Sequence, residues 1–283
     1  MTTAAAPPIV TGVDGSVESL DAVRWAARAA RLRDAPLEIV YALDFSALLA
    51  GGVVPPPEEM KDVVRARGRR YLRAAAELAT AQGLPDATTR LDPDRAALAL
   101  IDASRTASLL VVGSSGHGKL TGLLAGSVAS AVSAHASCDT VVVRGDTWDE
   151  PGAADRPVVA GVDGGEATER ILAAALTEAR VRKAPLVVVH AAADDSRHGE
   201  SPVGAGQRLP ADRLRAQDTE GVAVDEAVVA THPRRELIER SATAQLVVLG
   251  NRGRGGFPGL LLGSTGQALL HNAACPVYLV RVG

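Results

Sequence analysis

Residues 109–116 form an aliphatic run that ends in small residues, and they read Leu-Leu-Val-Val-Gly-Ser-Ser-Gly. Nine residues separate Gly116 from Gly126-Ser127, which closes the stretch, so its form is G-x2-G-x9-G-S. The aliphatic residues predict a buried strand, and glycine at the end of a strand lets backbone N–H groups approach a ligand closely. We expect a helix from Ser127, whose free N–H groups and positive dipole end suit a phosphate. The stretch therefore predicts a nucleotide-binding loop.

The same arrangement occurs twice along the chain. Residues 246–249, Leu-Val-Val-Leu, precede Gly250 and Gly253, and Gly263-Ser264 closes the second copy. Upstream, Ile-Val-Thr-Gly-Val-Asp-Gly at 9–15 returns as Val-Val-Ala-Gly-Val-Asp-Gly at 158–164. The early segments are displaced by 149 positions and the glycine clusters by 137, which means that the second copy has lost a net 12 residues in between. A repeat of this kind indicates two homologous domains.

The domain boundaries follow from the repeat and from local composition. We expect a first domain over 1–145, a linker over 146–156 and a second domain over 157–283. The linker is polar and carries glycine and proline, which is typical of a domain boundary, and Trp148 is a candidate to dock it. A chain of 283 residues has room for two domains of ordinary size, each with its own core.

Composition narrows the class of protein. An apolar share of 47% excludes a disordered chain, and an aromatic share of 2% requires a core built mainly from Val, Leu, Ile and Ala. The formal charge of −3 shows no basic excess for nucleic acid, so we interpret the arginines between Arg65 and Arg73 as a solvated helix face. Two cysteines, Cys138 and Cys275, are too few for a disulfide framework, and each precedes a final strand where a small apolar residue packs well.

The sequence predicts no membrane segment. Its apolar runs stay well short of the roughly 18 to 20 residues that span a bilayer, and residues 1–8 lack the basic segment and apolar stretch of a secretion signal. We therefore expect a cytoplasmic protein.

Strands and helices alternate in both halves, which predicts α/β domains with parallel sheets and helices on both faces. In the first half we expect strands at 8–13, 37–42, 88–91, 109–112 and 140–144, and helices from Ser16 to near Asp34 and over 58–82, 94–107 and 127–136. In the second half we expect strands near 157–162, 186–191, 222–229, 246–249 and 276–282, with a second helix that is short or frayed.

A strand order of 3-2-1-4-5 would place the first and fourth strands side by side at a topological switch point, where ligands bind beyond the carboxyl ends of the strands. Asp14 and the Gly113 loop would then flank one crevice, and Asp163 and the Gly250 loop the other.

These residues resemble a known family. A carboxylate after the first strand, in Gly12-Val13-Asp14-Gly15, together with G-x2-G-x9-G-S after the fourth strand resembles the ATP-binding type of universal stress protein. The duplicated layout is similar to the tandem form of that family, and the resemblance covers nearly the whole chain. It implies the adenine-nucleotide α-hydrolase type of fold and an ATP, with or without Mg²⁺, in each domain.

The resemblance also implies a role for each matching position. The ribose would meet Gly12 and Asp14 in the first domain, and Gly161 and Asp163 in the second. The adenine would meet the backbone of Ala42 or Ala191, and Asp44 and Asp194 could each reach a ribose hydroxyl. The phosphates would be held by Gly113, Ser115, Gly116, Gly126 and Ser127, and in the second domain by Gly250, Arg252, Gly253, Gly263 and Ser264.

Simpler interpretations of the same residues stay open at this point. Asp14 and Asp163 could cap the helices that follow them. Gly113 and Gly250 could be tight turns without a ligand. Residues 113–119 satisfy G-x4-G-K, but Leu120 stands where a P-loop needs Ser or Thr to bind Mg²⁺, so that motif is set aside. Lys119, Arg252 and Arg254 could add positive charge beside phosphates.

No catalytic or metal-binding constellation is expected. The histidines show no metal-ligand spacing, there is no G-x-S-x-G motif, and His190 is interpreted as a packed or hydrogen-bonded core residue. Three hypotheses for function remain: an ATP-binding stress-response regulator, a slow ATPase or nucleotidyl-transfer enzyme, and a nucleotide-free interaction module. In the family the last strand mediates pairing, so 140–144 and 276–281 are candidates for an intrachain pseudo-dimer, with a homodimer and a regulatory protein as further partners. Neither nucleic acid nor membrane is expected as a partner.

Overall fold

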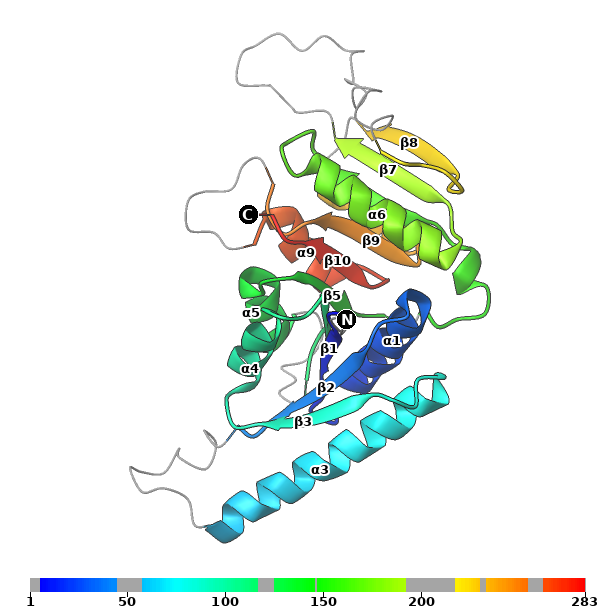
Figure 1. Ribbon diagram of the computed structural model, residues 1–283. Helices are drawn as coiled ribbons and strands as arrows, with labels where there is room; N and C mark the ends of the chain where they lie inside the picture. The colour runs from blue at the N-terminus through cyan, green and yellow to red at the C-terminus, as the bar shows by residue number, and fades with distance from the viewer. Residues whose placement is uncertain are drawn as a thin grey trace, which may run out of the picture. The chain divides into compact units, whose positions relative to one another are not determined.

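The computed structural model divides into two compact units, Met1–Val143 and Arg144–Gly283 (Figure 1). It describes residues 6–44, 58–116, 125–145, 147–191, 217–229, 233–253 and 262–282.

The first unit contains five parallel strands in the order β3-β2-β1-β4-β5, as the sequence predicts. Their bounds are β1 (Ile9–Gly12), β2 (Leu37–Ala42), β3 (Thr88–Asp92), β4 (Leu109–Gly113) and β5 (Asp139–Val143). Because Thr11 pairs with Val111, the carboxyl ends of β1 and β4 lie side by side. This is the switch point at which the candidate residues were expected.

Helices cover both faces of this sheet. They are α1 (Val17–Arg33), α3 (Glu58–Ala81), α4 (Ala96–Ala103) and α5 (Ser127–His135). Helix α1 packs on α3, α4 packs on α5, and the two pairs lie on opposite sides of the strands (Figure 1).

Local chemistry sets the ends of α1 where the sequence predicts them. The Ser19 N–H donates to Ser16 Oγ at 3.2 Å, which caps the helix, and Asp34 ends it in the left-handed region at φ 51°. Helix α4 is shorter than the expected 94–107, because Arg95 has an extended backbone and the chain leaves the helix at Ser104. The Ser104 hydroxyl donates to Ile101 O and accepts from Ser137 N.

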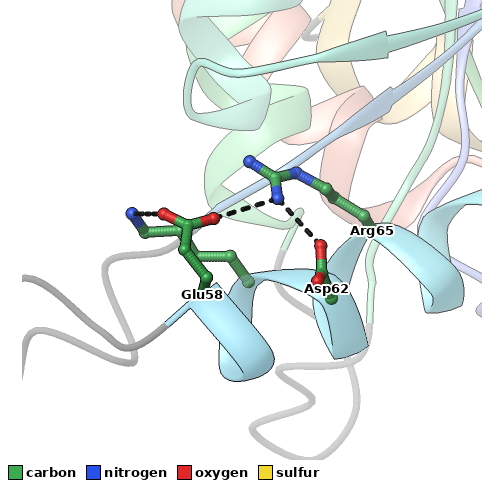
Figure 2. Close-up of polar contacts among 4 residues, drawn as sticks. Glu58, Asp62 and Arg65 are labelled. Atoms are coloured by element: carbon green, nitrogen blue, oxygen red, sulfur yellow. Dashed lines mark hydrogen bonds and ion pairs between the residues drawn. The ribbon is translucent and has the colours of Figure 1, made fainter.

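Helix α3 begins at Glu58 as predicted and ends just before Gly83, which has φ 83°. Figure 2 shows its first turns: Glu58 accepts hydrogen bonds from Lys61 Nζ at 2.6 Å and from Arg65 at 3.3 Å, and Arg65 also donates to Asp62 at 2.9 Å. The bond from Lys61 is the main reason that the pKa of Glu58 is lowered. These groups are solvated, so the network orders the start of the helix and contributes little stability.

The second unit repeats the strand order as β8-β7-β6-β9-β10. Its strands are β6 (Val158–Val162), β7 (Leu186–Ala191), β8 (Val224–Val229), β9 (Leu246–Gly250) and β10 (Val277–Val280), and all described pairings are parallel. The helices are α6 (Thr168–Arg182), α8 (Pro233–Ser241) and α9 (Ser264–Asn272), with a 3-10 turn at Ala153–Asp155. The predicted short second helix falls on residues 192–216, outside the described residues.

The repeat extends to packing details that sequence comparison alone does not give. Lys183 ends α6 at φ 54°, as Asp34 ends α1. Ser241 Oγ accepts from Ala274 N, as Ser104 accepts from Ser137. The units differ at the start of their first helix. Gly165 replaces the capping Ser16, and α6 begins at Thr168 behind Ala167, which makes no side-chain cap.

The cores are aliphatic, as the composition requires, with Val, Leu, Ile and Ala filling the sheet faces. Trp148 is buried, and its indole N–H donates to Gly145 O at 3.1 Å. Cys275 is fully buried, whereas Cys138 is only half-buried. No helix within the described ranges is both long enough and apolar enough to cross a bilayer.

The burial of Cys275 gives a testable prediction. Desolvation raises the pKa of its thiol from 9.0 to about 12. Alkylation of the native protein near pH 8.5 should therefore modify Cys138 and spare Cys275, with both modified after unfolding in denaturant, as counted by intact mass.

Because the unfolded thiol loses its proton at a lower pH than the folded one, the contribution of Cys275 to stability is present below about pH 9 and is lost as the pH rises toward 12. Rapid alkylation of native Cys275 would contradict the buried position, and Cys275→Ala should remove this part of the alkaline instability.

Candidate functional site

Asp14 lies just beyond β1 and uses its two carboxylate oxygens differently. Oδ1 accepts from the Ser16 N–H at 2.9 Å and from Ser16 Oγ at 2.6 Å. Oδ2 lies against the backbone of Gly116, where a Cβ atom would overlap it. Asp14 therefore does not cap α1 itself, because one of its oxygens bonds to Ser16, the capping residue, while the other faces the glycine loop.

The second unit repeats this geometry. Asp163 Oδ1 accepts from Gly165 N at 2.8 Å, and a Cβ on Gly253 would lie 3.3 Å from Asp163 Oδ2. The structure thus brings together the aspartate and the glycine loop of each half, as the predicted strand order requires. The approach is closer in the first unit.

Each glycine loop is closed by a backbone hydrogen bond between its two ends. The Gly126 N–H donates to Ser114 O at 2.7 Å, and the Gly263 N–H donates to Asn251 O at 2.8 Å. This places the first turn of α5 or α9 beside the start of its loop. Residues 117–124 and 254–261, which include Lys119 and Arg254, lie outside the described residues.

The helices that follow these loops begin without a side-chain cap. Gly126 and Gly263 occupy the N-cap positions of α5 and α9, and neither position makes a side-chain cap hydrogen bond. Ser127 and Ser264 stand first in the helices and are exposed. First-turn N–H groups that lack a cap can donate to an anion, and the helix dipole favours negative charge there. The cradle therefore fits a phosphate group.

Other glycines of the predicted site lie against close neighbours, which are backbone atoms at Gly113 and Gly250 and the ends of leucine side chains at Gly12 and Gly161. A Cβ on Gly12 would lie 2.8 Å from Leu100 Cδ1, and one on Gly161 would lie 2.7 Å from Leu237 Cδ1. A Cβ on Gly113 would lie 2.5 Å from the carbonyl oxygen of Glu18 in α1. On Gly250 it would lie 2.8 Å from Arg252 O. These positions bring strands close to helices and turns, which explains their glycines without a ligand.

The backbone N–H and C=O of Ala42 lie at the end of β2, where the edge of a ligand could contact them. Ala42 pairs with Asp92 of β3, and the neighbouring Leu43 N–H donates to Asp92 O at 2.7 Å. Because hydrogen bonding alternates between the two sides of a strand, the N–H and C=O of Ala42 point toward the β1 side. There β1 has already ended, since its last pair is Gly12 with Val40. Ala191 holds the same strand-end position in β7, where it pairs with Val229.

The remaining predicted residues are placed as follows. Ser115 is half-buried within the first loop, and its counterpart Arg252 is half-buried with a buried Nε that has no partner among the described residues. Asp44 is exposed, and Asp194 lies outside the described residues. His190 is packed in the core as expected, but its Nδ1 makes no hydrogen bond in the described part of the chain.

Tyr71 of α3 is a neighbour of the site that the sequence does not reveal. Gly15 follows Asp14 at φ 91°, and a Cβ built on it would lie 2.7 Å from Tyr71 Cδ1. The pattern of α3 places Tyr71 on a half-buried face, but nothing in the sequence shows which strand turn that face meets. Within the described ranges, no group of three His, Cys, Asp or Glu side chains could hold a metal ion.

The sequence model of the universal stress protein family matches residues 7–144 and 156–281, once in each half. The chain belongs to the universal stress protein family. A universal stress protein of Mycobacterium tuberculosis is 35% identical over 285 residues, and the alignment covers 96% of both chains.

Solved structures of the family also resemble the chain. The crystal structure of a universal stress protein from Archaeoglobus fulgidus has a TM-score of 0.71 and 18% identity, covering 98% of this chain and 99% of that one, and it supports the fold of both units. A universal stress protein solved in complex with cAMP covers 50% of this chain and 99% of that one, at 30% identity and a TM-score of 0.39.

The hydrogen bonds of Asp14 lead to a stability prediction. Asp14→Ala leaves the N–H and hydroxyl of Ser16 without their acceptor, which should lower the free energy of unfolding by about 1 to 3 kcal/mol. Asp14→Asn keeps an oxygen at this position and should cost clearly less. Denaturant unfolding measures both, with the exposed Glu77→Ala as a control expected to change stability by less than about 0.5 kcal/mol. Equal stability of Asp14→Ala and the unmodified protein would contradict the turn-capping role.

Proposed function

We propose that this universal stress protein binds ATP in each of its two units and acts as a nucleotide-dependent regulator. The observation that carries the proposal is the meeting of an aspartate oxygen, a glycine loop and an uncapped helix start at the carboxyl ends of neighbouring strands, once in each unit. Ligands of open parallel sheets bind at this kind of position.

Each part of an adenine nucleotide has a suitable neighbour in the first unit. Phosphates would accept hydrogen bonds from the first-turn N–H groups of α5 and from Ser127. The ribose hydroxyls would donate to Asp14 Oδ2, the oxygen that does not accept from Ser16. The adenine edge would meet the N–H and C=O of Ala42. The corresponding positions of the second unit are Ser264, Asp163 and Ala191.

A magnesium ion that accompanies the triphosphate would be ligated mainly by phosphate oxygens and water. Mg²⁺ commonly takes only one or two carboxylates from a protein when it binds with a nucleotide.

The proposed role is regulatory because the geometry supports binding rather than turnover. Oδ1 of Asp14 accepts the hydrogen bonds from Ser16 at the start of α1, and Oδ2 lies against the backbone of Gly116 in the glycine loop. Nucleotide occupancy would then act by favouring one conformation, provided that a partner interacts differently with the free and the bound states. Such a partner, self-association of whole chains and a cytoplasmic location all belong to this proposal.

Calorimetric titration with ATP tests the proposal. The unmodified chain should bind two ATP molecules, and Gly116→Val or Gly253→Val should each leave one, because a branched side chain fills the space between loop and aspartate. The double variant should bind none, while the exposed Val63→Ala variant should retain both sites.

Three results would contradict the proposal in different ways. Absence of binding to the unmodified chain would favour a nucleotide-free interaction module. A single site in the unmodified chain, with an affinity that Gly253→Val leaves unchanged, would show that only the first unit binds. Multiple-turnover hydrolysis that disappears in the glycine variants would favour an enzyme, and phosphate release measures it.

A further inference from the structure

We propose that the outer face of α3 is a docking surface for a short acidic segment of another protein. The surface consists of four exposed arginines in the middle of the helix, and we call it the α3 arginine patch: Arg67, Arg69, Arg70 and Arg73. The inference goes beyond the proposed binding of ATP and does not depend on it. It gives the regulatory partner a place on the chain and a chemistry.

The patch lies on the side of α3 that faces away from the first unit. Helix α3 packs on α1, β2 and β3 (Figure 1), and its buried residues lie along one side of the helix. Arg67, Arg70 and Arg73 follow one another at intervals of three residues, which places them along one exposed stripe. Arg69 lies beside Arg73, one turn earlier. At 1.5 Å per residue, the four positions extend over about 9 Å of the helix axis.

The first unit offers the patch no acidic partner. Among the described residues, none of its four guanidinium groups forms an ion pair. The parts of this unit outside the described residues are 1–5, 45–57 and 117–124, and their sequences contain no Asp or Glu. The charge of the patch is therefore not neutralised within the first unit.

Arg65 shows the contrast on the same helix. Its guanidinium donates to Glu58 and Asp62, so it is paired within the first turns (Figure 2). After Asp62, the next acidic residue of the helix is Glu77. Glu77 follows Arg73 by four residues, but the two side chains form no ion pair in the described structure.

The arginines of the patch repel one another. Arg67 and Arg70 are three residues apart, as are Arg70 and Arg73, and Arg69 and Arg73 are four apart. Like charges at these spacings are neighbours on a helix and destabilise it slightly. The guanidinium of Arg70 is also held in place, since it lies 5.4 Å from the centroid of the Tyr71 ring, within the range of a cation–π contact. A partner that supplies carboxylates would relieve the repulsion.

Acidic residues at both ends of the patch favour a short ligand over a long polyanion. Glu59 and Glu77 lie on the same stripe, because they are 11 residues before and 7 residues after Arg70, close to whole numbers of helical turns. A nucleic acid or an anionic lipid surface extends beyond the patch and would bring its negative charge against these carboxylates. A segment with three or four carboxylates within two helical turns would cover the arginines and stop short of both ends.

An exposed apolar side chain adds a second element of recognition. Val63 is 61% exposed and lies one turn before Arg67 on the outer stripe. Arginine binds a carboxylate through paired hydrogen bonds, and an apolar side chain of the ligand can pack on Val63. Arginine clusters recognise acidic motifs in other proteins in this way. The ligand should therefore combine several carboxylates with one apolar residue.

Fluorescence anisotropy with a labelled peptide tests the patch. The probe is a 12-residue peptide with one leucine, followed by glutamates at positions spaced i, i+3, i+4 and i+7. It should bind the unmodified chain, and its affinity should fall as salt is added, because exposed ion pairs are screened. A peptide with glutamine in place of every glutamate should bind much more weakly.

Neutralising the patch should weaken binding of the glutamate peptide by about tenfold, because several exposed ion pairs of modest strength are lost together. The variant is Arg67→Gln with Arg70→Gln and Arg73→Gln, since glutamine has nearly the helix propensity of arginine. Circular dichroism checks that this variant is folded, and ATP titration should give the stoichiometry of the unmodified chain.

A matched control separates the patch from net charge. Arg105→Gln with Arg234→Gln and Arg235→Gln removes the same number of positive charges at exposed positions elsewhere. Its affinity for the glutamate peptide should stay close to that of the unmodified chain.

Several outcomes would overturn the inference. Equal affinity of the patch variant and the unmodified chain would do so, as would equal affinity of the unmodified chain for the two peptides, which needs no variant to fold. Tighter binding of a DNA duplex or of phosphatidylserine vesicles that is lost in the patch variant would assign the patch to nucleic acid or to a membrane. Self-association lost in that variant, measured by sedimentation velocity, would assign it to a second copy. Absence of ATP binding would remove the proposed function alone.

Discussion

The close approach of an aspartate oxygen to a glycine backbone is the constraint on which both sites depend. It requires that β1 and β4, or β6 and β9, be neighbours in a parallel sheet, so that residues about a hundred positions apart end at one edge. In the first unit it also leaves no room for a side chain on the loop residue, since a Cβ on Gly116 would overlap the Asp14 carboxylate, whereas a Cβ on Gly253 would lie 3.3 Å from that of Asp163. The other glycines of the predicted motif serve a different purpose, because they let the strands pack against Leu100, Leu237 and the first turn of α1.

Much of this arrangement could be predicted because it depends on local patterns that occur twice. Aliphatic runs predicted the positions of the strands, and Ser16 and Asp34 predicted the ends of α1. The repeats indicated that both halves have the same strand order. The meeting of Asp14 with Gly116 followed from that order. The different surroundings of the two Asp14 oxygens could not be predicted, because they depend on where each oxygen points.

Features that depend on packing between distant segments could not be predicted. The contact of Tyr71 with Gly15 requires the register of α3 against β2, which a helical pattern gives only to within a turn. Helix α4 is shorter than expected because Arg95 has an extended backbone at its start, and at its end the Ser104 hydroxyl bonds to Ile101 O and Ser137 N. The lack of a partner for His190 Nδ1 among the described residues likewise depends on what surrounds the ring and not on its place in an aliphatic strand.

The backbone bond that closes each glycine loop has a consequence for how such proteins diverge. Since the Gly126 N–H is tied to Ser114 O, and the Gly263 N–H to Asn251 O, the chain leaves and re-enters at a fixed point. The intervening segment can then change in length or charge at a small entropic cost, because closure of a longer excursion adds only a fraction of a kcal/mol. Evolution can thus change the sequence of that segment without disturbing the helix start at its base, which has no side-chain cap.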